Sequence, residues 1–443
     1  MPHEALWFLI VGVLLMFVAL ARGPIARLPL TGAMIYLVAG VIVGPGVLGL
    51  VNADLAQSVR TLTVIAEAGL VVSLFSVGMH LRVRLRDPLW RLPLRLGVLA
   101  MILSVALTFA LAWAMGMPAG VALFLAAALA PTDPVLANEL RVHEAGDAEP
   151  VRFALSGEGG LNDGAALPFA LLGLALCGVP AAATQSALMF AASLLWGVAG
   201  ALLIGAGLAT LCARLVFHLR TRYGEAVGVD GFIAIGLMSV TYGAALLVHA
   251  YAFVAVFAAG VALRHAELRA TGEQHSPAET LETVQLGERT EVATDPRRAH
   301  VWLAEGMTGF TLEIEHFAEL SLLLIIGCVV SAHWRDMLEP QALAIALALV
   351  FVVRPLAVMG SMIGARADGQ QRRLMAWMGI RGVGAFYYAI WGLDQAGDTL
   401  QPVLAAALDA IVISVALHGS TAGYVLRRYY RRAQDRRERS SSV

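Results

Sequence analysis

Thirteen apolar stretches follow one another along the chain, and they constrain its fold more than any other feature. A membrane-spanning helix needs about 20 mostly apolar residues, because lipid offers no partner for an exposed backbone N–H or carbonyl. The stretches lie near residues 5–22, 28–50, 61–81, 93–116, 118–137, 153–176, 185–216, 226–247, 248–263, 316–332, 341–363, 373–394 and 401–426. Only 14% of the residues are charged, against roughly 25% in a soluble domain. The sequence therefore predicts an all-α polytopic membrane protein with about 13 transmembrane helices.

The arginines predict how these helices are oriented. The sequence contains no lysine, and 27 of its 31 arginines fall on one side of the membrane if the N-terminus lies outside the cell. Arg60 and Arg335 fall on the other side, while Arg354 and Arg381 lie within apolar stretches. Positive residues accumulate on the cytoplasmic side. We therefore expect an N-terminus outside and a C-terminus in the cytoplasm, in the inner or plasma membrane of the cell.

Changes in composition divide the chain into four parts. Residues 1–263 hold the first nine predicted spans, and residues 316–426 hold the last four. Residues 264–315 contain ten acidic residues against five arginines, which predicts an acidic, solvated cytoplasmic loop, with a regulatory element as the alternative. Residues 427–443 form a basic tail, which we expect to contact anionic lipid and not nucleic acid.

The fifth and twelfth predicted spans contain residues that interrupt helices. Pro131 and Pro134 each remove a backbone donor and disfavour helix at the preceding residue. In the twelfth span, three glycines surround Arg381. Paired broken spans in the two halves of a transporter indicate inverted repeats with an ion site where the broken helices cross.

Carboxylates accompany these breaks. Thr132 and Asp133 lie between the two prolines, and Glu158, Asn162 and Asp163 lie in the sixth span. An ionisable group at membrane depth costs about 2.5–3.5 kcal/mol, so these groups are predicted to face a polar cavity. Oxygen atoms are the ligands that a hard monovalent cation prefers, and a desolvated carboxylate binds a proton when the cation leaves. Competition between proton and cation for one carboxylate is sufficient for coupled exchange.

Structural roles are the alternative for some of these residues. Asp133 has the chemistry of an N-cap for the half-helix that begins at Pro134. Arg354 and Arg381 need counter-charges at depth, and Glu158 is the natural partner of one of them. The sequence leaves open which arginine it pairs with.

At these residues the chain resembles members of the monovalent cation:proton antiporter superfamily, in its electroneutral sodium/proton exchanger branch. The matching segments are Pro131-Thr132-Asp133-Pro134, Glu158 through Asn162-Asp163-Gly164, Arg354-Pro355, Gly379-Ile380-Arg381-Gly382 and Ser414 through His418-Gly419. The resemblance implies that Asp163 carries the cation and the proton, that Asn162 stabilises its helix, and that Thr132 and Asp133 complete the cation site. It also implies a Glu158–Arg354 pair, Arg381 near the crossing, and a six-helix core beside a dimerisation domain, hence a homodimer.

The sequence departs from this family pattern at two positions. Members often have serine where this chain has Gly159, and a carboxylate after a Leu-Phe pair where this chain has Ser76. Both changes remove an oxygen from the site, which leaves potassium or a broader cation preference open.

The sequence thus predicts a secondary transporter, not an enzyme, that exchanges Na⁺ for H⁺, with Li⁺ or K⁺ as alternative cations and no cofactor. Asn162 takes the place of a second carboxylate in electrogenic relatives, so one-to-one electroneutral exchange is expected. The first alternative is a K⁺/H⁺ antiporter of the same fold. An intramembrane aspartyl protease using Asp133 and Asp163 is the alternative from another class, although the chain has no Pro-Ala-Leu element. A channel is a third alternative, but no filter-like repeat occurs.

Overall fold

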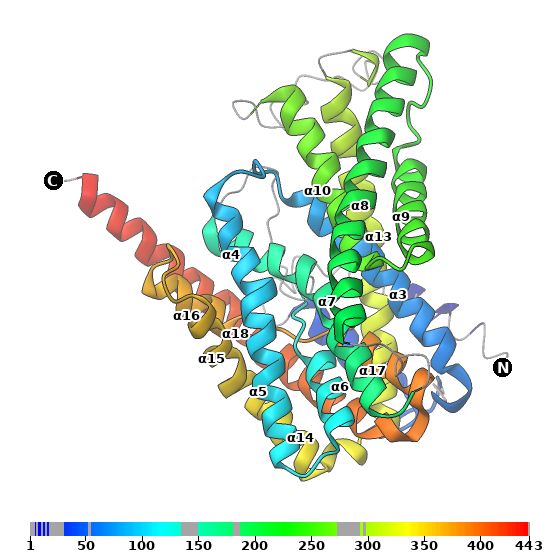
Figure 1. Ribbon diagram of the computed structural model, residues 1–443, viewed down its shortest axis with the longest axis vertical. Helices are drawn as coiled ribbons and strands as arrows, with labels where there is room; N and C mark the ends of the chain where they lie inside the picture. Colours follow the sequence, from blue (N-terminus) through cyan, green and yellow to red (C-terminus); the bar gives the residue numbers. More distant parts are fainter. Residues whose placement is uncertain are drawn as a thin grey trace.

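The computed structural model describes residues 31–51, 55–133, 149–179, 187–272, 293–295 and 298–441, with a few isolated positions before residue 17. Within these residues the chain forms helices and no strand (Figure 1). The helices of the first half are α2 (Gly32–Val43), α3 (Leu55–His80), η1 (Pro88–Trp90), α4 (Arg91–Leu94), η2 (Arg95–Ala100), α5 (Met101–Ala114), α6 (Ala119–Leu129), α7 (Pro150–Leu176), α8 (Ala187–Tyr223), α9 (Asp230–Leu247) and α10 (Ala252–Thr271). Those of the second half are α13 (Ala299–His333), η4 (Asp336–Leu338), α14 (Pro340–Ala348), η5 (Leu349–Val353), α15 (Arg354–Ser361), α16 (Gly369–Trp377), α17 (Val383–Ala396), η6 (Gly397–Leu400) and α18 (Gln401–Ser441).

The prediction of an all-helical membrane protein is confirmed. Eight described helical segments are long and apolar enough to cross a membrane, and α2 and α6 are shorter apolar helices. The first predicted span lies largely outside the described residues, so the predicted number of 13 stays a prediction. The turn at residues 248–251 separates α9 from α10, as the sequence predicted for the eighth and ninth spans.

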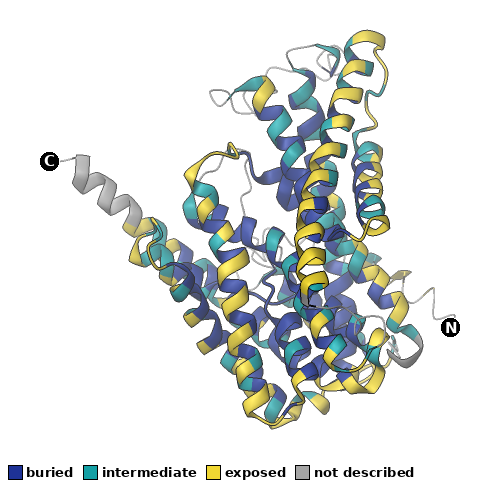
Figure 2. Cartoon of the chain, in the orientation of Figure 1, coloured by how far each residue is buried: buried dark blue, intermediate teal, exposed yellow. Residues whose placement is uncertain are grey.

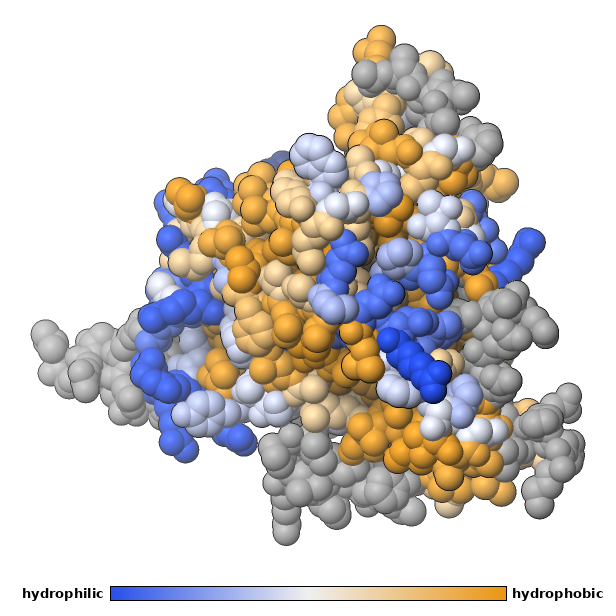
Figure 3. Space-filling view, turned by 90° about the horizontal axis from the view of Figure 1, so that it is seen from below, coloured by the Kyte–Doolittle hydropathy of each residue, from blue (hydrophilic) through white to orange (hydrophobic). Residues whose placement is uncertain are grey.

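Helices that are apolar on all sides lie at the centre of the bundle. Residues 252–261 of α10 and 383–390 of α17 are buried without exception, as expected for helices without a polar face. By contrast, α8 and α9 keep large apolar side chains exposed, including Leu195, Leu203 and Phe232 (Figure 2). Seen from below Figure 1, hydrophilic groups lie between broad apolar surfaces (Figure 3). Such apolar flanks suit contact with lipid chains.

Three helices are longer than a bilayer requires. The 37 residues of α8, the 35 of α13 and the 41 of α18 each exceed the roughly 30 Å hydrocarbon core at about 1.5 Å per residue. Figure 1 shows α8 extending to one extreme of the bundle and α18 leading out to the C-terminus. The basic tail from residue 427 therefore continues the last helix.

The predicted acidic loop 264–315 differs from the structure at both ends. Helix α10 continues to Thr271 and α13 begins at Ala299, while residues 273–292 lie outside the described residues. Arg264 and Glu267 are buried, not solvated. Glu267 pairs with Arg82 at 2.9 Å, and Arg264 pairs with Glu305 at 2.7 Å. These charges are buried because they neutralise one another, which composition alone does not reveal.

The two halves of the bundle share irregularities that inverted repeats predict. One π-helical segment, η2, lies in the helix before α6, and another, η5, lies in the helix before α16 and α17. Each therefore precedes a broken helix. The main-chain break after α6 begins at residue 130, and the break between α16 and α17 covers residues 378–382.

Candidate functional site

The two breaks meet and bond to each other. We call residues 130–133 and 378–382 together the crossing. The backbone N–H of Asp133 donates to the Ile380 carbonyl at 2.8 Å, and the N–H of Val383 donates to Asp133 Oδ2 at 2.9 Å. Pro131 has no N–H to donate, and Gly382 adopts φ −156° and ψ −127° just before α17. Extended backbone at the predicted membrane depth is tolerated because these contacts satisfy it within the protein.

Arg381 holds the end of α6. Its guanidinium Nη1 donates to the carbonyls of Ala130 and Pro131 at 2.7 and 2.8 Å. The last carbonyls of a helix have no intrahelical partner, and they carry the negative end of the helix dipole. Its backbone N–H donates to the Ser414 hydroxyl of α18 at 2.6 Å. Arg381 therefore lies at the crossing: it belongs to the second broken segment and donates hydrogen bonds to the carbonyl end of the first.

Helix α7 presents Asn162 and Asp163 to this crossing. The Asn162 side-chain amide donates to the Thr132 hydroxyl at 2.9 Å, and both residues are buried. Among the described residues, Asn162 Oδ1 has no hydrogen-bond partner. Asp163 is 4% exposed, and its carbonyl accepts a hydrogen bond from the Tyr388 hydroxyl of α17. These contacts fix α7 against both sides of the crossing.

Small residues allow the neighbouring helices to approach Asp163. A Cβ atom at Gly384 would lie 2.6 Å from Asp163 Oδ1. Cβ atoms at Gly160 and Gly164 would meet Phe257 and Val254 of α10.

Helix α7 begins at Pro150, whose missing N–H costs nothing at a first helical position, and the Glu149 carboxylate accepts from the next two N–H groups.

Glu158 pairs with Arg354, one turn before Asn162 on α7. Arg354 Nη2 donates to Glu158 Oε2 at 2.9 Å, and Nη1 donates to Oε1. Arg354 also donates to the carbonyls of Met375 and Met378 at 3.1 and 3.0 Å, at the end of α16. Each arginine thus satisfies the carbonyl end of one broken helix. The choice between the two arginines that the sequence left open falls on Arg354.

A small cavity, which we call the central cavity, lies beside Asp133 and Asp163. Its lining residues are Gly69, Leu70 and Ser73 of α3, Asp133 of the crossing, Asp163 of α7, Glu315, Ala318, Glu319 and Leu322 of α13, and Val383 of α17. The room in it for water-sized species is about 20 Å³, which is enough for one water molecule or a small cation. The crossing therefore brings both predicted aspartates to a space of the right size for one ion.

The site contains residues that the sequence analysis did not single out. The polar loop that the sequence predicts at residues 264–315 includes Glu315, which lies within α13 and is buried. Gly384 is expected from the sequence only to interrupt a helix, and its contact with Asp163 depends on the fold. A signal for Glu315 was available, because Glu319 follows it by one helical turn inside an apolar segment.

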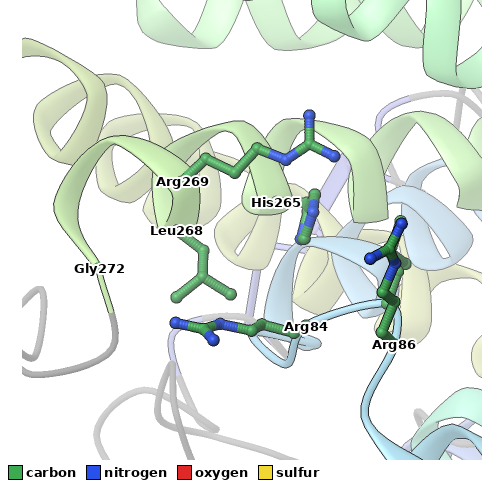
Figure 4. Close-up of a pocket in the computed structure, with 7 residues that line it drawn as sticks. Arg84, Arg86, His265, Leu268, Arg269 and Gly272 are labelled. Carbon is green, nitrogen blue, oxygen red and sulfur yellow. The ribbon is translucent and has the colours of Figure 1, made fainter.

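A larger cavity elsewhere has the opposite charge. About 490 Å³ in volume, it is lined by Arg84 and Arg86 after α3, by His265 and Arg269 of α10, and by three uncharged residues (Figure 4). Burial, Arg269 and Arg84 lower the pKa of His265. The described residues that line it include no carboxylate, so they do not offer a cation the ligands that the central cavity does.

Comparison with known proteins identifies the family of this chain. The family model described as sodium/hydrogen exchanger, transmembrane, matches residues 12–428. The chain belongs to this family. This exchanger is an integral membrane protein and a cation:proton antiporter, a transporter and not an enzyme, which decides against the intramembrane protease.

Solved structures share its fold. One is the sodium proton antiporter MjNhaP1 from Methanocaldococcus jannaschii at pH 8, with a TM-score of 0.69 and 19% identity, covering 94% of this chain and 96% of that chain. An electron-microscopy map of MjNhaP1 gives a TM-score of 0.70 and 17% identity, covering 97% of this chain and 98% of that chain. The exchanger therefore has the antiporter fold along almost its whole length.

Proposed function

We propose that the exchanger transports Na⁺ against H⁺ in a one-to-one, electroneutral exchange at Asp163. The observation that carries the proposal is the placement of Asp163 at the central cavity, buried and next to the Asp133 of the crossing. A buried carboxylate is stable when it holds either a cation or a proton. Release of one species therefore favours binding of the other, which couples the two fluxes.

The remaining residues of the site have supporting roles in this proposal. Asp133 adds oxygen ligands at the cavity. The Thr132 hydroxyl, which is held by the Asn162 amide and is not among the described residues that line the cavity, is proposed as a further ligand. Asn162 contributes no charge, so α7 supplies one exchangeable acid at the level of the cavity, not two. Glu158, Arg354 and Arg381 hold the broken helices and do not bind the cation. Asp133 stays ionised through the cycle because it caps α17 at its positive end.

The test is transport in proteoliposomes. Wild-type protein is reconstituted, and proton flux is followed with a pH-sensitive dye while Na⁺, Li⁺ or K⁺ is added. Na⁺-driven flux is expected in the wild type. Loss of that flux is expected in folded Asp163→Asn protein, since an amide keeps the shape but not the exchangeable charge. Flux that persists in correctly assembled Asp163→Asn protein would contradict the assignment.

The same vesicles test the stoichiometry. Valinomycin and fixed K⁺ concentrations clamp the membrane potential while Na⁺ drives the exchange. An end-point that does not respond to the potential fits a one-to-one exchange. An end-point that shifts with the potential contradicts it and implicates a second proton carrier, with Asp133 the first candidate. Flux driven by K⁺ in place of Na⁺ would favour the potassium alternative, in keeping with the oxygens missing at Gly159 and Ser76.

Assembly and orientation belong to the same proposal. A homodimer would bury part of the apolar surface of α8 and α9, where Leu195, Leu203 and Phe232 are exposed. Lipid would cover the rest. The N-terminus outside and the C-terminus in the cytoplasm follow from the arginines. Cross-linking in native membranes and protease access to each terminus check both points.

A further inference from the structure

Glu315 brings another carboxylate to the central cavity from a different set of helices. It lies on α13, is 1% exposed, and lines the cavity together with Asp133 and Asp163. Its Oε2 atom accepts a hydrogen bond from the Ser76 hydroxyl of α3 at 2.7 Å. Helices α13 and α3 pack against each other, whereas the two aspartates belong to the crossing and to α7. Carboxylates thus reach the cavity from α13 on one side and from the crossing and α7 on the other.

Several carboxylates share the central cavity. Asp133, Asp163, Glu315 and Glu319 are among the residues that line it. Carboxylates in one confined space repel each other, and burial adds the cost of lost hydration. A cation in the cavity relieves both effects. The lining therefore favours a cation, and Glu315 lines the same space as Asp163.

A hydrogen bond from Ser76 fixes the position of the Glu315 carboxylate. The Ser76 hydroxyl of α3 donates to Glu315 Oε2 of α13 at 2.7 Å. The α3 hydroxyl thereby orients a carboxylate that lines the central cavity. Both side chains are buried, so this bond is shielded from competing water.

We propose that Glu315 is a cation-binding residue, whose carboxylate completes the oxygen shell around the ion held by Asp163. Ser76 is the positioning residue for Glu315. The proposal rests on the antiport proposed above and adds a ligand to the same site. In this proposal Glu315 adds a ligand to the cation and the exchanged proton stays assigned to Asp163, so loss of Glu315 weakens cation binding without stopping exchange.

The test compares Glu315→Gln with wild type over a range of Na⁺, Li⁺ and K⁺ concentrations in proteoliposomes. The cation concentration at half-maximal rate is expected to rise about tenfold, which is the size of one charge-assisted contact, with a maximal rate within about twofold of wild type. Ser76→Ala should raise it about threefold, as expected for loss of one neutral donor. Glu313→Gln is the matched control, because Glu313 lies on the same helix and is exposed; it should change nothing.

A second readout measures binding without transport. Purified protein in detergent is melted at increasing cation concentration, and Glu315→Gln should need about ten times more cation for the same stabilisation. An unchanged half-maximal concentration in both assays overturns the proposal. If Glu315→Gln fails to fold, Glu315→Asp replaces it: a shifted half-maximal concentration with normal proton coupling supports the proposal, and a wild-type value overturns it.

The two proposals fail in distinguishable ways. Wild-type protein that is stabilised by a cation but moves no protons refutes the antiport assignment and leaves Glu315 to be judged by the melting shift. Wild-type protein that exchanges normally while Glu315→Gln behaves like Glu313→Gln refutes the role of Glu315 alone. Wild-type protein that shows neither exchange nor stabilisation refutes both.

Discussion

Asp133 bonds twice across the crossing to the second broken helix: its carboxylate accepts from the N–H of Val383 at 2.9 Å, and its own N–H donates to the Ile380 carbonyl at 2.8 Å. A negative group thereby lies at the positive end of α17. Arg381 does the converse for the carbonyl end of α6. Oppositely charged side chains thus stabilise the two helix ends at the crossing. In the structure Asp133 caps α17. The sequence predicted that it caps a half-helix beginning at Pro134, and that residue lies outside the described residues.

The cap predicts that the charge and the hydrogen bond of Asp133 can be separated. Asp133→Asn keeps an oxygen that can accept from Val383, so its stability should stay within about 1 kcal/mol of wild type, whereas Asp133→Ala should lose about 1–2 kcal/mol. Exchange should fall at least about tenfold in Asp133→Asn, because a charged ligand of the cation is gone. Thermal melting and proteoliposome flux measure the two effects. Normal flux in Asp133→Asn would restrict Asp133 to capping.

The Glu158–Arg354 pair predicts coupled stability. Glu158→Ala leaves a buried guanidinium without its carboxylate and should destabilise the protein by about 3–5 kcal/mol. The double variant Glu158→Ala with Arg354→Ala should recover part of this loss, although the carbonyls of Met375 and Met378 then lack their donor. Melting of the four proteins in detergent gives the coupling energy. Purely additive losses would show that the pair adds nothing to stability.

The breaks of the fold were predictable because their causes are local. Proline lacks an N–H wherever it stands, and glycines next to Arg381 weaken a helix regardless of its neighbours. Those residues located the crossing, and apolar length located most helices. The bonds that join the breaks, such as that from Val383 to Asp133, depend on segments about 250 residues apart, which no local pattern specifies.

Charged residues were harder to place, because polarity in a sequence does not tell burial from exposure. Glu267 reads as part of a solvated loop, and the structure buries it against Arg82. Glu315 was missed for the same reason, since its polar neighbours set the start of the tenth predicted span one residue after it. Glu158 could be expected to pair with an arginine at depth, and the choice between Arg354 and Arg381 required three-dimensional contacts.

The contact between Gly384 and Asp163 predicts a steric effect on the site. In Gly384→Ala the new methyl group would lie 2.6 Å from Asp163 Oδ1, so the carboxylate or α17 must move. We expect a loss of about 1–3 kcal/mol in stability and a marked rise in the half-maximal cation concentration. Gly207→Ala on α8 is the control, because no atom lies within 4 Å of its new Cβ. Equal behaviour of the two variants in melting and flux would rule out the steric effect.

Competition at Asp163 predicts how the exchange depends on pH. If a proton and a cation exclude each other from one carboxylate, protons raise the half-maximal cation concentration without lowering the maximal rate. Where the empty site is mostly protonated, each unit of decrease in pH should raise that concentration about tenfold, because one proton must leave for each cation bound. Where it is mostly ionised, the concentration should be independent of pH.

Initial rates at equal pH on both sides of the vesicle membrane, over a series of cation concentrations, give the slope. A slope near one supports a single competing carboxylate, whereas a slope near two would mean that Asp133 or Glu315 also takes up a proton. A maximal rate that falls with acidification, at constant half-maximal concentration, would exclude competition as the coupling mechanism.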